Sequence, residues 1–147
     1  MRSLISRAAT VAAVLLAVSA CKKEAPPPDP VPPAPAVEPV SVTSLDLGKA
    51  IGPDKRVVNS MDNFGLRDTI YAAVGTSGNT AGTLTARWTF EASGQTVDST
   101  TLSITPTGPA VTEFHIMNTS AWPAGKYKVT IMLNGAPAKD KGFEIKR

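Results

Sequence analysis

Hydrophobic and polar residues alternate with a period of two over most of residues 41–147, which is typical of half-buried β-strands. The clearest run is 126–133, where lysine, threonine and methionine separate the apolar residues Tyr127, Val129, Ile131 and Leu133. Asn134-Gly135 follows, a dipeptide typical of two-residue hairpin turns because both residues tolerate positive φ. We therefore expect a C-terminal hairpin whose return strand turns Phe143 and Ile145 inward, with Pro137 near the turn.

Five further segments show the same alternation, and turn-forming residues separate them. The expected strands are 42–47, 69–75, 84–91, 100–105 and 111–117, with 75–78 read as a loop. Their expected inward-facing residues are Val42 with Leu45 or Leu47, Ile70, Ala72, Val74, Leu84, Ala86, Trp88, Phe90, Leu102, Ile104, Phe114 and Ile116. Seven strands without a helix predict an all-β sandwich of two sheets, because a single sheet would leave an apolar face in water.

The N-terminal residues follow a different pattern, that of an export signal. Arg2 and Arg7 precede an apolar run at 8–18, which is too short for a bilayer-spanning helix of about 20 residues. A basic segment followed by a short apolar one is typical of a secretory signal peptide. We expect residues 1–20 to be removed from the mature protein.

The end of this signal, Val18-Ser19-Ala20-Cys21, resembles the lipobox of bacterial lipoproteins. The resemblance implies a diacylglycerol on the Cys21 thiol, cleavage before Cys21, and an acyl chain such as palmitate on the new amine. Two such signals give stable membrane anchoring. Cys21 is thus the predicted lipid-attachment site. The alternative is an ordinary secretory signal cut after Ala20, which leaves a free thiol.

The residue after the lipidated cysteine bears on localisation. In lipoproteins of diderm bacteria, aspartate at that position favours retention in the inner membrane. Lys22 stands there instead, so the resemblance implies the outer membrane. In a monoderm host the corresponding place is the outer face of the plasma membrane.

Residues 21–40 are predicted to form a proline-rich linker. Eight of the chain's 13 prolines lie between Pro26 and Pro39, and proline disfavours both helices and central strands. Such a segment favours an extended polyproline II spacer that reaches roughly 60 Å at about 3.1 Å per residue. The alternative is a ligand for a partner, because residues 30–33 match the P-x-x-P pattern.

Residues 41–147 resemble the immunoglobulin-like or fibronectin type III sandwich. Trp88 lies on the third expected strand. Tyr127 opens the penultimate strand after the turn Trp122-Pro-Ala-Gly-Lys, in the place of the tyrosine-corner residue of such domains. The cysteine pair of antibody domains is absent. Because Cys21 is the only cysteine, its lipidation would leave the monomer without a disulfide.

Charge argues against nucleic acid as a partner. The chain has 15 basic and 12 acidic residues, a formal net charge of +3. Removal of Arg2 and Arg7 with the signal leaves 13 basic residues against 12 acidic ones, or +1. The basic residues are spread along the sequence, whereas binding to nucleic acid needs a basic stripe that displaces counterions.

Few residues suggest chemistry. His115, the only histidine, has Glu113 beside it on the outward face of a strand, and no nucleophile is placed with it. Asp54, Asp62 and Asp68 match no calcium loop and are expected to form turns and cap strands. Trp122 is expected to pack over a sandwich end, with Tyr71 and Trp122 as alternative exposed aromatics of a binding site. We predict no catalytic, metal or cofactor site.

The sequence therefore predicts a non-enzymatic binding or structural module, anchored to a membrane by acyl chains and displayed on a proline-rich stalk. Its expected partner is an envelope protein or a glycan. The alternative is an accessory subunit or folding factor of an envelope complex that works by strand-edge pairing.

Overall fold

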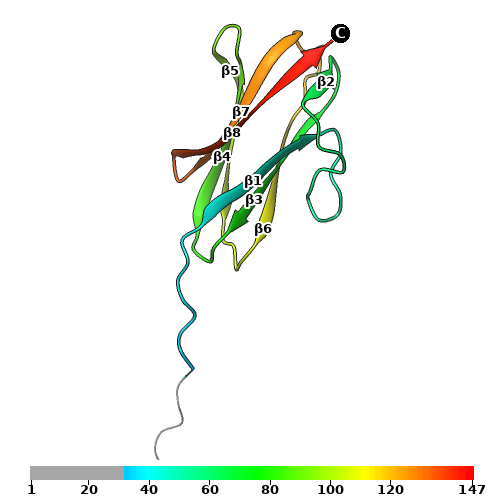
Figure 1. Ribbon diagram of the computed structural model, residues 1–147. Coiled ribbons are helices and arrows are strands. Elements are labelled where there is room, and N and C mark those ends of the chain that lie inside the picture. The colour runs from blue at the N-terminus through cyan, green and yellow to red at the C-terminus, as the bar shows by residue number, and fades with distance from the viewer. Residues whose placement is uncertain (1–31) are drawn as a thin grey trace, which may run out of the picture. The chain divides into compact units, whose positions relative to one another are not determined.

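The computed structural model describes residues 32–147, so the expected signal peptide, Cys21 and the first part of the linker lie outside the described residues. Eight strands form: β1 (Ser41–Gly48), β2 (Asn63–Gly65), β3 (Ile70–Ser77), β4 (Gly82–Phe90), β5 (Gln95–Ile104), β6 (Ala110–Ile116), β7 (Gly125–Leu133) and β8 (Ala136–Lys146) (Figure 1). Within residues 32–147 no helix is long and apolar enough to cross a membrane.

The strands make two sheets that face each other. One has the order β1-β3-β6 and the other the order β2-β8-β7-β4-β5. Neighbouring strands are antiparallel except β2, which runs parallel to β8. Both sheets turn alternate side chains into one core between them, which contains Leu47, Ile70, Val74, Leu84, Trp88, Phe114, Tyr127, Val129, Ile131, Phe143 and Ile145.

The predicted immunoglobulin-like sandwich is confirmed in these details. The Tyr127 hydroxyl donates a hydrogen bond of 2.8 Å to the carbonyl oxygen of Pro123, four residues earlier, which is the tyrosine-corner contact. The β7–β8 turn has positive φ at Asn134 (51°) and Gly135 (83°), as a type I′ turn requires. Trp88 is fully buried and packs edge-to-face on Phe143, with ring centroids 5.9 Å apart.

Four details differ from the expectations. β5 begins at Gln95 instead of Thr100, because β4 pairs with it along this whole length. β2 was not expected, because three residues are too short to show alternation. Residues 75–77 belong to β3 rather than to a loop, since β1 and β6 both pair with that end of the strand. Leu102 was expected in the core but remains 39% exposed, because β5 forms a sheet edge.

A set of polar contacts closes one end of the sandwich around Asp68. One carboxylate oxygen of Asp68 accepts from the Gly65 amide at 2.6 Å and lies 2.6 Å from the Lys49 ammonium. The indole nitrogen of Trp122 donates to the Asp68 carbonyl at 3.0 Å. Trp122 thus packs over the sandwich end as predicted. Hydrogen bonds from Lys49 and Gly65 hold the pKa of Asp68 below its ordinary value.

The lowered pKa of Asp68 gives a testable dependence of stability on pH. The unfolded chain binds a proton at Asp68 more readily than the folded one, so this stabilisation is present above about pH 4 and is lost as the pH falls through the folded pKa. We expect Asp68→Asn to lower the free energy of unfolding at pH 7 by about 1 kcal/mol. It should also flatten the acid limb of urea denaturation measured between pH 7 and pH 2.

Lys49→Ala is the graded control, because it removes the ion pair but leaves the Gly65 hydrogen bond. It should flatten the acid limb only in part. An unchanged acid limb in Asp68→Asn would show that these contacts do not contribute to acid stability.

Candidate functional site

A hollow of the domain lies between the free edges of the two sheets. β5 ends one sheet and β6 ends the other, while β1 and β8 contact each other on the opposite flank. The start of β5 and the end of β6 line a cavity of about 560 Å³, called the groove below. Its lining consists of Phe90, Gln95, Thr96, Val97, Asp98, His115, Ile116, Met117, Asn118, Trp122, Pro123 and Tyr127.

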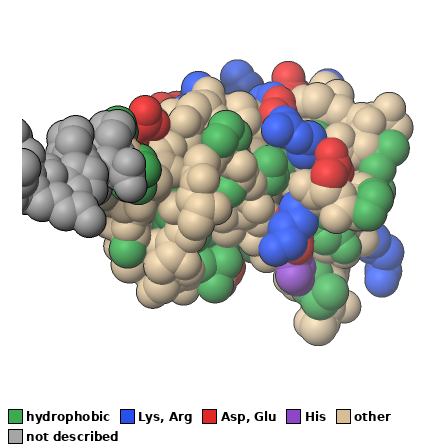
Figure 2. All heavy atoms as spheres, turned by 90° about the horizontal axis from the view of Figure 1, so that it is seen from below, with side chains coloured by type: hydrophobic (Ala, Val, Ile, Leu, Met, Phe, Trp, Pro, Cys, Tyr) green, Lys and Arg blue, Asp and Glu red, His purple; other side chains and the backbone are tan. Residues whose placement is uncertain are grey.

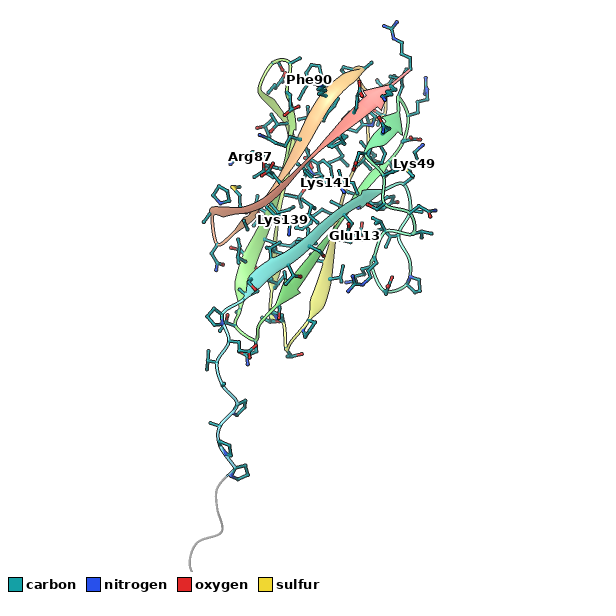
Figure 3. The ribbon with its side chains drawn as sticks, in the orientation of Figure 1. Lys49, Arg87, Phe90, Glu113, Lys139 and Lys141 are labelled. Atoms are coloured by element: carbon teal, nitrogen blue, oxygen red, sulfur yellow. The ribbon has the colours of Figure 1, made fainter. Side chains whose placement is uncertain are left out.

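The floor of the groove is apolar and rigidly held. Trp122 and Tyr127 are buried. The ring of Phe90, which is labelled in Figure 3, has its centroid 4.8 Å from that of Tyr127. The Tyr127 hydroxyl is already bonded to Pro123. Burial raises the pKa of Tyr127, so the phenol stays neutral near pH 7. The floor therefore offers apolar contact rather than a reactive group.

A β-bulge shapes the β5 wall of the groove. Trp88 pairs with Asp98 and Thr89 pairs with Thr96, which leaves Val97 without a partner on β4. Val97 lines the groove and is 39% exposed, and Met117 on the facing wall is 66% exposed. Bulges of this kind redirect side chains at sheet edges. The result is a pair of exposed apolar side chains at the groove's rim.

His115 and Glu113 lie together at the groove's other rim, as their expected places on one strand face imply. The Nδ1 atom of His115 is 2.7 Å from a Glu113 oxygen, and its ring centroid is 5.5 Å from that of Tyr71. The imidazole is exposed, and the only histidine is visible at the surface in Figure 2. No hydroxyl is hydrogen-bonded to this pair among the described residues, so the geometry provides no activated nucleophile.

The other sequence-predicted residues are dispersed. Asp54 accepts from the Arg56 amide at 3.1 Å and Asp68 from the Gly65 amide, so both take the expected turn-forming roles. Asp62 lies 3.3 Å from the Lys141 ammonium. Within residues 32–147 no group of three or more metal-ligating side chains converges.

Sequence reasoning missed the groove itself. Phe90 was expected in the core and Met117 at a strand end, and neither position signals a cavity. The unpaired Val97 depends on a register shift between β4 and β5, which only the pairing shows. Five of the ten residues over 95–104 are serine or threonine, and this polar composition is the sequence feature that indicates an exposed strand.

Comparisons with known proteins bear on the fold alone. Neither a protein-family model nor a curated protein matches the chain. Solved structures resemble it at low identity. An immunoglobulin-like protein from Pseudomonas aeruginosa shares 12% identity over 74% of this chain and 97% of its own, with a TM-score of 0.47. A β-glucosidase from Erythrobacter marinus shares 7% identity over 74% of this chain, with a TM-score of 0.53.

A β-glucosidase from Listeria innocua shares 7% identity over 75% of this chain, with a TM-score of 0.50. The chain spans only 16% of the length of each β-glucosidase. Identities this low show a common sandwich architecture. They transfer no activity, because one fold hosts many unrelated functions.

Gly125 keeps Phe90 in place and provides a test of the groove's floor. Its φ is +149°, and an added Cβ would approach Phe90 Cε2 at 2.8 Å. We expect Gly125→Ala to lower the free energy of unfolding by about 1–3 kcal/mol through backbone strain and displacement of the ring. Thermal denaturation measures the loss, and NMR shifts of the Val97 and Met117 methyl groups report the ring's movement.

Gly108→Ala is the matched control. Gly108 has a φ of +136°, but an added Cβ there meets nothing within 4 Å. This variant should lower the free energy of unfolding only through backbone strain, and the NMR shifts of the Val97 and Met117 methyl groups should stay unchanged. Equal effects of both variants on these shifts would contradict the role assigned to Gly125.

Proposed function

We propose that this chain is a lipid-anchored, non-enzymatic binding module, displayed from an envelope membrane on a proline-rich stalk. The groove carries the binding role: about 560 Å³ with an apolar floor, two exposed apolar rim residues and no activated nucleophile within the described residues. Its lining combines these apolar side chains with polar ones such as Asp98 and Asn118, and hollows that combine both kinds of group are a common form of binding site. Val18-Ser19-Ala20-Cys21 supports the anchor, and Lys22 supports the outer membrane.

The way the stalk meets the domain supports display. Asn79, in the turn between β3 and β4, binds the incoming segment through both its side chain and its backbone. Its carboxamide accepts from the Glu38 amide at 2.7 Å and donates to the Ala36 carbonyl at 2.8 Å. Its amide donates to the Glu38 carbonyl at 3.0 Å. The end of the stalk is therefore fixed on the domain rather than loosely attached.

A second candidate function is that of an accessory subunit or folding factor that acts by strand-edge pairing. The ten residues of β5 favour it, because nine are exposed and no strand within residues 32–147 pairs with their outer edge. Extended segments of a partner add to such edges through main-chain hydrogen bonds. The two functions share a surface and differ in the partner.

The anchor is tested by the intact mass of the chain extracted from the membranes of a bacterium that produces it. We expect the mass of residues 21–147 plus a diacylglycerol and an amide-linked acyl chain. Density fractionation of the same membranes of a diderm host should place the chain in the outer membrane. Cys21→Ser should abolish acylation, because only a thiol forms the thioether.

Ser19→Ala is the matched control, since it keeps a small residue at a neighbouring lipobox position and should remain acylated. An unmodified chain that begins at Cys21 would make the protein a soluble exported one. That result would overturn the anchor and the stalk together.

The stalk contact makes a separate prediction. Asn79→Ala removes the side-chain hydrogen bonds to Ala36 and Glu38. NMR order parameters for the amides of Ala36 and Glu38 should then fall from the rigid value of about 0.85 to below about 0.6. The melting temperature should change little, because both bonds are exposed.

Asn118→Ala is the control for this variant. It also removes an exposed asparagine that bonds to a backbone amide, that of Ser120 at 3.1 Å. Its effect should stay within the β6–β7 loop. Unchanged order parameters at Ala36 and Glu38 in Asn79→Ala would show that Asn79 does not hold the stalk.

A further inference from the structure

We propose that the partner is an extended peptide segment of another protein, which adds as a strand to β5 and places an apolar side chain in the groove with a basic side chain beside Asp98. This inference rests on the proposed binding function and names the class of its partner. It follows from four features of the described residues: a weakly protected edge, the groove beside it, the charge of that edge, and the place where the stalk enters.

The two flanks of the sandwich differ in how well their sheet edges are protected against the addition of a further strand. On the flank where β8 faces β1, the strand β8 turns Lys139 and Lys141 inward (Figure 3). Lys139 donates to the Thr43 carbonyl at 3.0 Å, and Lys141 lies 3.3 Å from Asp62. Inward-pointing charges and short edge strands block the addition of further strands. β2, the last strand of that sheet, has only three residues.

The β5 flank is protected less: its one inward-facing charge is the carboxylate of Asp98, and its one irregularity is the bulge at Val97. β5 is ten residues long and contains no lysine, arginine or proline. Nine of its residues are exposed, and the strand bends only at the Val97 bulge. Its outer row of amides and carbonyls faces away from β4, and no other strand of the described part of the chain pairs with it. An edge of this length and composition is a template for an added strand.

The groove lies where the added strand would need it. A strand beyond β5 extends that sheet over the gap in front of β6, so its inward side chains enter the space between the sheets. Val97 and Met117 flank this space and are 39% and 66% exposed. Main-chain bonds along the edge then supply affinity, and the groove selects the side chain.

Asp98 defines the charge of the partner. It is the only ionisable residue of β5, it lines the groove, and its carboxylate accepts from the Thr100 hydroxyl at 3.3 Å. No lysine or arginine lines the groove to neutralise it, and His115 is paired with Glu113 instead. A lysine or arginine two positions from the apolar residue of the peptide lies on the same strand face and pairs with Asp98.

A second copy of this chain fits the edge less well. An antiparallel pair of β5 strands would reverse one domain, so the two stalks would leave at opposite ends, and one stalk would have to run back along the pair to reach the same membrane. A parallel pair related by a two-fold axis along the strands would turn one copy over and leave both grooves unfilled. A glycan fits less well too, because Trp122 and Tyr127 are 7% and 1% exposed, and Tyr71 is half-buried with its ring beside His115.

The test uses the full chain purified from membranes in detergent and held through a C-terminal tag. A phage-displayed library of random peptides of about ten residues, the usual span of an added strand, is the probe. Selected sequences should alternate apolar and polar residues and carry a basic residue two positions from an apolar one. A selected peptide is then synthesised, and its dissociation constant is measured by fluorescence anisotropy.

Thr100→Lys transfers the protection of the other flank to β5. Thr100 is exposed and faces inward opposite Ala86. A lysine at this position corresponds to Lys139 on the other flank. We expect it to weaken binding of the peptide about tenfold or more. Ser103→Lys puts the same charge on the outward face of the same strand and should change binding by less than about threefold.

Met117→Ala and Asp98→Asn separate the two specificity contacts. Met117→Ala should weaken binding of the peptide, because it removes a contact to the peptide's apolar residue. Asp98→Asn should weaken binding only of peptides that carry the basic residue. Both side chains are exposed or at the rim, so the fold tolerates these changes. A peptide in which the basic residue is replaced by alanine completes the comparison for Asp98.

The absence of selected peptides, or peptides that bind Thr100→Lys as well as the unchanged chain, would overturn the proposal. A dimer in detergent that Thr100→Lys dissociates would replace the peptide with a second copy. These outcomes are independent of acylation. An acylated chain whose edge takes no peptide refutes only this inference, whereas an unmodified Cys21 refutes only the anchor.

Discussion

The side chain of Tyr127 lies between the hydrophobic core and the groove, and both depend on its position. Its hydroxyl is bonded to the Pro123 carbonyl, while its ring stacks on Phe143 with a centroid distance of 5.4 Å and an interplanar angle of 17°. Phe90 and Trp122 contact the same ring at 4.8 Å and 6.3 Å. The phenol thus ties the β6–β7 connection to β7, and its apolar ring forms the groove's floor.

This arrangement has an energetic consequence for a small domain without disulfides. Cys21 is the chain's only cysteine, so the sandwich relies on packing of its aromatic cluster and on polar contacts at its ends. One contact in the core is incomplete: the indole nitrogen of Trp88 is buried and has no hydrogen-bond partner. An unsatisfied buried donor costs about 1–3 kcal/mol. Burial of the whole Trp88 side chain, which includes its edge-to-face contact with Phe143, must outweigh that cost.

The two flanks of the sandwich have opposite properties, and the stalk has its own place on the domain. Lysines and a short last strand protect the flank of β8, while the flank of β5 and β6 keeps a long free edge and the groove. Asn79 binds the stalk in the β3–β4 turn. The groove is lined by the start of β5 and the end of β6, and none of its lining residues belongs to that turn. The proposed anchoring and the proposed binding therefore use different parts of the domain.

The sequence by itself determined the elements whose information is local. Alternation placed seven of the eight strands, Asn134-Gly135 specified a type I′ turn, and the spacing of Trp122 and Tyr127 predicted the tyrosine corner. Glu113 and His115 were placed together because residues two apart on a strand share a face. The lipobox at Cys21 is also a local pattern, and it stays a prediction from sequence.

Only the tertiary structure decided which strands end the sheets. Leu102 alternates like a core residue, yet it stays exposed because β5 has a neighbour on one side only. β2 exists because β8 offers it a partner, and the groove exists because a register shift leaves Val97 unpaired between two free edges. Alternation reports the face that a side chain takes, whereas strand order and register depend on contacts between residues far apart in the chain.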